Sequence, residues 1–171
     1  MNSVTRSGGL AGIARTISFA ALWVACAMIL AVILVLNHMI VIRLLGEPVV
    51  WHLELSIYLT IGAFFLGTPY AVLSRGDVAI DLLNAVLSPR KAGSLRIAVL
   101  LVMLTTAAYL VWSGLGRTLE AMHSNLRSTS LWGPPLWPVY ATMPLGLALA
   151  CLQMLAELSD SIARLRQEKT P

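Results

Sequence analysis

Charged residues are scarce in this chain of 171 residues. They make up 12% of it, against about 25% in a typical soluble domain, while the mean hydropathy is +0.81. Four stretches contain no Asp, Glu, Lys or Arg: 16–42, 55–74, 97–116 and 128–156. Each is long enough to cross a hydrocarbon core of about 30 Å as a helix. The composition therefore excludes an ordinary soluble protein and predicts an integral membrane protein.

The lack of charge at membrane depth also excludes most chemistry. A proton relay or an ion pathway needs ionisable groups inside the bundle, and the four stretches contain no Asp, Glu, Lys or Arg. The sequence shows no nucleophile motif and no phosphate-binding glycine loop. We therefore expect that the chain is not an enzyme and has no catalytic residue.

Cysteine and histidine are sparse as well. Cys26 and Cys151 lie inside spanning stretches, so neither a disulfide framework nor a thiolate metal site is indicated. His38, His52 and His123 fall near the predicted outer ends of helices, whereas a bis-histidine haem site needs two imidazoles that face each other inside the bundle. We expect no metal site and no cofactor.

The apolar stretches predict an all-α bundle of four transmembrane helices, one domain over 1–171, with spans at 16–42, 53–74, 97–117 and 136–158. The first uncharged run is 27 residues long, beyond the core of about 7–15 residues in a signal peptide, so we expect it to be retained. Small residues at four-residue spacing would let helix backbones approach closely: Ala21 and Ala25, Ala27 and Ala31, Ala63 and Gly67, and Gly146 and Ala150.

Basic residues predict the orientation. Nine of the twelve Lys and Arg residues lie in the two termini and the middle loop, and three lie in the other two loops, so both termini are predicted to be cytoplasmic. Anionic lipid explains the net charge of +4 without nucleic acid. An aromatic belt at the outer interface agrees with this frame: Trp51, Trp112, Trp132, Trp137 and Tyr140.

The predicted cytoplasmic loop contains a short amphipathic pattern. Apolar residues recur at helical spacing over 77–88, Asp77 can cap the start, and Pro89 disfavours continuation. A helix of this length cannot span a bilayer, so we expect it to lie along the membrane surface. It is either a connector that covers the inner end of the bundle or an element that docks a partner.

On the outer side, the third helix is predicted to project beyond the lipid until Gly133, Pro134 and Pro135 break the chain. The projecting part forms a mixed-charge surface composed of Arg117, Glu120, His123 and Arg127. This surface is either a solvated helix end or a contact site for a soluble periplasmic partner.

Glu54 is the sharpest polar signal, because it opens a run without charge that lasts until Arg75. In the first turn of a helix, the macrodipole favours a carboxylate by about 0.3–1 kcal/mol. The alternative is an ion pair or hydrogen bond with a basic group such as Arg43, which would tie the first two helices together or face a larger subunit.

The run "RLLGEPVVWHLELSIYLTIGAFFLGTPYAVLSRGDVAIDLL" resembles the small, Q-type membrane subunit of tripartite ATP-independent periplasmic (TRAP) transporters. The matching positions are Arg43, Trp51, Glu54, Gly67, Tyr70 and Asp81. The segment "PLWPVYATMPLGLALACLQML" resembles the family's fourth helix, through Trp137, Tyr140, Pro144 and Gly146. Two positions depart from the family pattern: Leu53 stands where a second acid is common, and Asp77 where a histidine is common.

The resemblance implies a non-catalytic subunit in a bacterial inner membrane. Its partners would be a large multi-helix subunit, which moves substrate and sodium in an elevator-type cycle, and a periplasmic substrate-binding protein that delivers organic acids. The candidate subunit-interface or structural residues are then Arg43, Trp51, Glu54, Asp77, Asp81, Trp137, Tyr140 and Pro144. The mixed-charge outer surface becomes the candidate docking surface for the binding protein.

Two other interpretations remain open at this point. An independent four-helix exporter needs a carboxylate in its translocation path, typically in the first helix, and 16–42 contains none. A membrane anchor or assembly protein outside any transporter would share the same hydropathy pattern.

Overall fold

The computed structural model describes residues 9–86 and 89–167, with side chains described at 12–74, 93 and 95–162. These residues form four helices, α1 (Gly9–Leu44), α2 (His52–Val86), α3 (Pro89–His123) and α4 (Trp137–Gln167). Within them, β structure is limited to an isolated antiparallel bridge between Arg127 and Pro135. The predicted all-α fold with four long helices is confirmed.

Every helix contains a segment long and apolar enough to cross a membrane. The four segments are Gly12–Leu44, His52–Ser74, Leu95–His123 and Trp137–Ile162. At about 1.5 Å per residue, even the shortest exceeds a hydrocarbon core of about 30 Å. The helices therefore reach into the polar layers at their ends, where side chains such as Arg117 can meet lipid headgroups.

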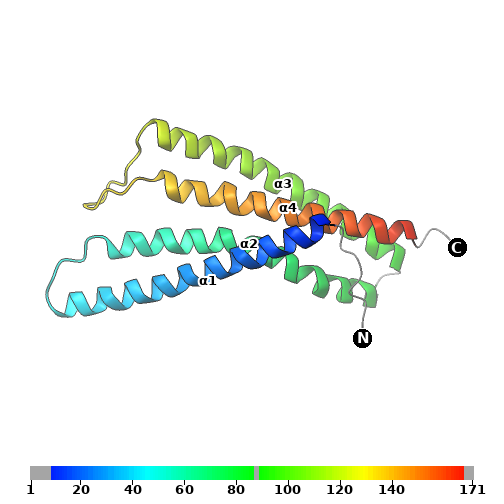
Figure 1. The fold of residues 1–171 in the computed structure, drawn as a ribbon, viewed down its shortest axis with the longest axis horizontal. Helices are drawn as coiled ribbons and strands as arrows, with labels where there is room; N and C mark the ends of the chain where they lie inside the picture. The colour runs from blue at the N-terminus through cyan, green and yellow to red at the C-terminus, as the bar shows by residue number, and fades with distance from the viewer. Residues whose placement is uncertain (1–8, 87–88, 168–171) are drawn as a thin grey trace.

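The four helices form two antiparallel hairpins, α1–α2 and α3–α4, joined mainly through contacts of α4 with α2. Figure 1 shows that the α1–α2 and α3–α4 connections lie together at one end of the bundle, whereas α1 begins and α4 ends at the other. We call the first end, formed by residues 45–51 and 124–136, the loop end. Because α2 and α3 make few contacts with each other, α4 is the helix that joins the two hairpins.

Small residues lie where the helix backbones approach most closely. A Cβ atom on Gly146 of α4 would collide with the backbone carbonyl of Phe65 in α2. A Cβ on Gly114 of α3 would lie 3.2 Å from Cδ of Pro144. Three of the four small-residue pairs contribute buried members to these interfaces, whereas Ala27 is exposed and Ala31 only half-buried. Close contact through small residues is the usual way in which helices associate in lipid.

Among the described residues, the polar side chains that are fully buried include no Asp, Glu, Lys or Arg, and apart from Nδ1 of His52 their buried polar atoms have hydrogen-bond partners. The Ser18 hydroxyl of α1 donates a hydrogen bond to Oε1 of Gln153 in α4 over 3.3 Å, and both residues are buried. Threonine hydroxyls donate hydrogen bonds to carbonyls of their own helix, as Thr60 does to Ser56 over 2.7 Å. Since water is absent at this depth, such internal pairing avoids the cost of several kcal/mol that each unsatisfied group carries in lipid.

The predicted short helix over 77–88 is not a separate element. α2 continues without a break through Val86, and residues 87–88 lie outside the described residues. Asp77 thus sits within α2 rather than at a helix start. The physical reason is that Gly76 alone stands before it as a helix breaker, and one glycine costs about 1 kcal/mol relative to alanine without ending a helix.

Candidate functional site at the loop end

Glu54 lies in the first turn of α2, as the sequence predicts, but its partners are not on α1. Its carboxylate accepts a hydrogen bond from the Ser130 hydroxyl and a longer one, 3.5 Å, from the Tyr58 hydroxyl. The Ser128 side chain lies close to the same carboxylate. Among the described residues, the ion pairs do not include Arg43. Of the two alternatives for Glu54, the structure shows the position at a helix start and does not show an ion pair with Arg43 among the described residues.

The reason is the shape of the α3–α4 connection, which folds back over the start of α2. The Ser128 amide donates to the Pro134 carbonyl over 2.9 Å, and the Leu136 amide donates to the Leu126 carbonyl over 3.0 Å. The Ser130 hydroxyl accepts a hydrogen bond from the Gly133 amide over 3.1 Å. These bonds hold Ser130 in position to bind Glu54, which lies 76 residues away in the chain.

Gly133 makes this loop geometry accessible. Its φ angle of 59° is in the left-handed region, which glycine adopts without the steric penalty that a Cβ brings. The turn lets the chain double back so that Arg127 and Pro135 form their bridge. As a result, the loop presents Leu131, whose side chain is 90% exposed, at the tip of the bundle.

A histidine pair closes the α1–α2 corner. Nδ1 of His38 and Nε2 of His52 are 2.9 Å apart, within hydrogen-bond distance, and the rings stack with their centroids 5.1 Å apart. Trp51 stacks on His52, with the two ring centroids 3.9 Å apart. His52 is 3% exposed, and its Nδ1 has no hydrogen-bond partner.

The sequence analysis missed this pair, because it treated the histidines as separate groups at helix ends. A signal was present: His38 and His52 are equidistant from Leu45, so an antiparallel hairpin that turns there brings them opposite each other. The two nitrogens bond each other directly, which leaves no room for a haem iron between them. The pair is a packed, hydrogen-bonded corner.

Arg43 remains exposed in the last turn of α1, where a cation is favourable because it faces the negative end of the helix dipole. Trp137 begins α4 and is 43% exposed. Pro144, by contrast, is buried in α4 against Gly114 of α3. Asp77 and Asp81 lie in the C-terminal part of α2, away from the loop end, and their side chains are outside the described residues.

The predicted mixed-charge surface divides into two parts. Arg117 and Glu120 form an ion pair across 3.8 Å on α3, with side chains 76% and 62% exposed. His123 ends α3, and Arg127 follows in the loop; both are exposed. The structure thus brings two of the four residues into direct contact and arranges the other two along the same end of the bundle.

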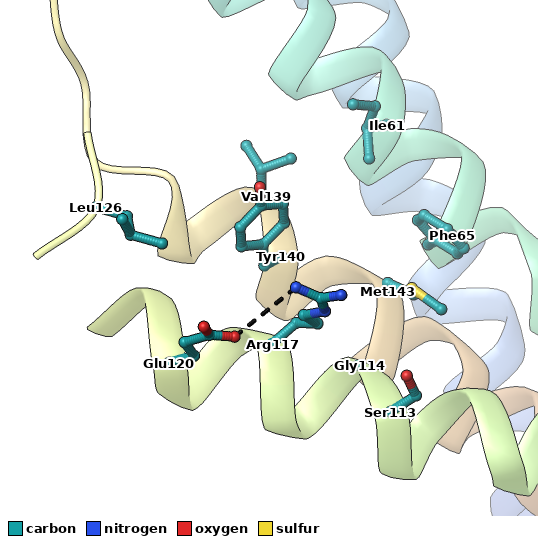
Figure 2. Close-up of a pocket in the computed structure, with 10 residues that line it drawn as sticks. All are labelled: Ile61, Phe65, Ser113, Gly114, Arg117, Glu120, Leu126, Val139, Tyr140 and Met143. Carbon is teal, nitrogen blue, oxygen red and sulfur yellow. Dashed lines mark ion pairs between the residues drawn. The ribbon is translucent and has the colours of Figure 1, made fainter. Parts of the chain in front are cut away.

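A groove of about 510 Å³ opens between the hairpins beside this ion pair. Figure 2 shows Ile61 and Phe65 of α2 across from α3, with α4 between them carrying Val139, Tyr140 and Met143. The Arg117 side chain extends from α3 toward α4 at the mouth of the groove (Figure 2). Most of the lining side chains are apolar, and the two charged ones, Arg117 and Glu120, are exposed.

In the part of the chain that the structure describes, no three His, Cys, Asp or Glu residues gather as metal ligands. The sequence also places no charge inside the four uncharged stretches. The loop end therefore contains the stacked rings of the histidine pair and Trp51, the Glu54 carboxylate hydrogen-bonded to Ser130, and exposed loop residues.

Residues 32–164 match the family described as "Tripartite ATP-independent periplasmic transporters, DctQ component". The matched region begins in α1 and covers α2, α3 and most of α4. Neither a curated protein nor a solved structure matches the chain.

Proposed function

Since the chain belongs to the DctQ component family of tripartite ATP-independent periplasmic transporters, we propose that it braces the large transport subunit and does not itself bind the solute. As a member of that family it is a multi-pass membrane protein and the small membrane subunit of such a transporter. The large subunit, in this proposal, carries organic acids together with sodium. A periplasmic binding protein delivers the solute.

The observation that carries the proposal is the neutral interior of the bundle. An organic anion or a coupling cation at membrane depth needs charged or strongly polar partners. The four uncharged stretches provide none, and the buried Ser18 and Gln153 are already bonded to each other. A bundle with this interior can hold another protein steady in the bilayer but is poorly equipped to bind ions.

The packing supports a stationary role. In an elevator-type cycle, one part slides through the bilayer while another stays fixed. Gly146 packs against the backbone of Phe65 and Gly114 against the ring of Pro144, and neither site has room for a larger residue, so the helices cannot slide past one another easily. Large exposed side chains such as Trp23 and Trp112 give the outside of the bundle broad contact with lipid or with the large subunit.

The loop end supplies the surface for the binding protein in this proposal. The Ser130–Glu54 bond fixes the α3–α4 loop, and Arg117, Glu120, His123 and Arg127 lie along the same end. This end faces the periplasm if the basic residues keep the termini cytoplasmic. The Glu54 carboxylate is at a helix start and hydrogen-bonded to the loop, which disfavours an exporter that would use it as a carrier group.

Stability of the large subunit tests the bracing role. We expect the large subunit, purified in detergent with and without this chain, to unfold at a lower temperature when it is alone. The matched control adds an unrelated four-helix membrane protein in place of this chain. An identical unfolding temperature in all three samples would contradict the bracing role.

A further inference from the structure

The groove between the hairpins needs an occupant in a membrane. Most of its lining is apolar, including Ile61, Phe65, Val139 and Met143, and apolar surface does not hold water. An empty groove would also lose the dispersion contacts that its lining atoms make when filled. Because the groove is open between two hairpins that make few contacts along α2 and α3, a lipid acyl chain can enter it from the side.

The charges at its mouth indicate the headgroup. The uncharged run 97–116 of α3 has the length of the hydrocarbon core, and Arg117 follows it directly. This position is the level of lipid phosphates. Arg117 and Glu120 lie on neighbouring turns of the helix with their charged groups 3.8 Å apart and well exposed. Such an exposed pair contributes little by itself, so both groups are available to a ligand that carries both charges.

We propose that this groove binds one zwitterionic phospholipid with a primary ammonium headgroup, of the phosphatidylethanolamine class. One acyl chain lies along Ile61, Phe65 and Met143. The Arg117 guanidinium donates hydrogen bonds to the phosphate, and the Glu120 carboxylate accepts a hydrogen bond from the ammonium. A purely anionic headgroup would meet repulsion from Glu120, and a choline headgroup has no N–H to donate. This site goes beyond the bracing role and does not depend on it. It places Arg117 and Glu120 at a lipid headgroup and leaves His123 and Arg127 of the mixed-charge surface for the binding protein.

Lipid retention by the purified full chain tests the headgroup chemistry. We would exchange the protein into mixed micelles with dioleoyl phosphatidylethanolamine, phosphatidylcholine or phosphatidylglycerol and count retained lipids by native mass spectrometry. The ethanolamine lipid should be retained about tenfold more strongly than either other lipid, the ratio expected for one hydrogen bond to a charged group. Equal retention of the three lipids would overturn the proposal.

Variants assign the two contacts. Glu120→Gln should remove the preference for ethanolamine over choline while Arg117→Gln lowers retention of all three lipids. Met143→Trp, which fills the groove with a larger apolar side chain, should displace the lipid even if one of the charge variants fails to fold. Arg43→Gln, which removes an exposed cation from α1 away from the groove, is the matched control and should change nothing. Retention unaffected by Met143→Trp would contradict binding in the groove.

A photo-cross-linker at Ser113, which lines the groove, tests the occupant in cell membranes that contain the other transporter subunits. The expected product is an adduct of this chain with the mass of a phosphatidylethanolamine. The same probe at Trp23, an exposed residue of α1, in membranes where this chain is expressed without the other subunits, should report the composition of the bulk lipid. A cross-link to a protein subunit at Ser113, or a lipid adduct no richer in ethanolamine than at Trp23, would overturn the proposal.

Discussion

At the scale of single residues, the α1–α2 corner depends on one buried ring nitrogen. Nδ1 of His52 has no partner, while Nε2 bonds His38. A buried polar atom without a partner costs about 1–3 kcal/mol. The contact with His38 therefore satisfies the one ring nitrogen of His52 that has a partner.

This pairing predicts non-additive losses of stability. His38→Leu leaves a second nitrogen of His52 unsatisfied and should cost about 1–3 kcal/mol in the free energy of unfolding. The double variant with His52→Leu removes both partners, so its loss should be smaller than the sum of the two single losses. Denaturation of the purified chain in detergent, followed by circular dichroism, measures all three. Strictly additive losses would mean that the two rings do not act as a pair.

A second prediction at this scale concerns the hydrogen bond between Ser130 of the α3–α4 loop and Glu54, which we call the latch. Glu54→Ala and Ser130→Ala remove opposite sides of the same hydrogen bond. Each should speed amide hydrogen exchange at Gly133, whose N–H is held by Ser130, and the double variant should exchange no faster than the faster single one. Tyr58→Phe, which removes only the 3.5 Å contact, is the control with little effect. Exchange at Gly133 that stays at the original rate in both variants would rule out the latch.

At the scale of helices, the glycine contacts predict which substitutions break the bundle. Gly146→Ala places a methyl group against the Phe65 backbone, which cannot move aside as a side chain can, so we expect a loss of about 1–3 kcal/mol. Gly116→Ala is the matched control, because nothing lies within 4 Å of its added Cβ and alanine favours a helix by about 0.5–1 kcal/mol. Thermal unfolding in detergent should separate the two. Equal stability of both variants would contradict the close α2–α4 approach.

The predicted orientation of the helices can be tested by labelling cysteines introduced near the helix ends. In a background without Cys26 and Cys151, Thr129→Cys lies in the α3–α4 loop and Asp160→Cys near the other end of the bundle. The distribution of basic residues predicts that a membrane-impermeant thiol reagent labels the first from outside intact cells and the second only after permeabilisation. The reverse pattern would invert the bundle and remove the loop end from the periplasm.

At the scale of the whole molecule, much of the fold could be predicted because the length of an uncharged run is read directly against the thickness of the bilayer. The four helices follow from that comparison. The continuation of α2 through Val86 was missed because the apolar pattern after Asp77 suggested a new start. A single glycine, Gly76, does not end a helix, and this outweighed the new start that the apolar pattern suggested.

The site was harder to predict, for a physical reason. Glu54 was found because a lone carboxylate stands out in an apolar run, but its partner Ser130 is far away in sequence. The groove was not found at all. In a membrane, surfaces that meet lipid and surfaces that meet protein are both apolar, so hydropathy cannot tell which residues, such as Phe65 and Met143, face a cavity.

Uptake by proteoliposomes tests the central claim most directly. Vesicles would contain this chain alone, the large subunit alone, or both, with the binding protein, a labelled organic acid and an inward sodium gradient supplied from outside. The four stretches that cross the membrane contain no Asp, Glu, Lys or Arg that could bind the acid or sodium. We therefore expect no uptake by this chain alone and the highest rate when both subunits are present. Sodium-driven uptake by this chain alone would contradict the account.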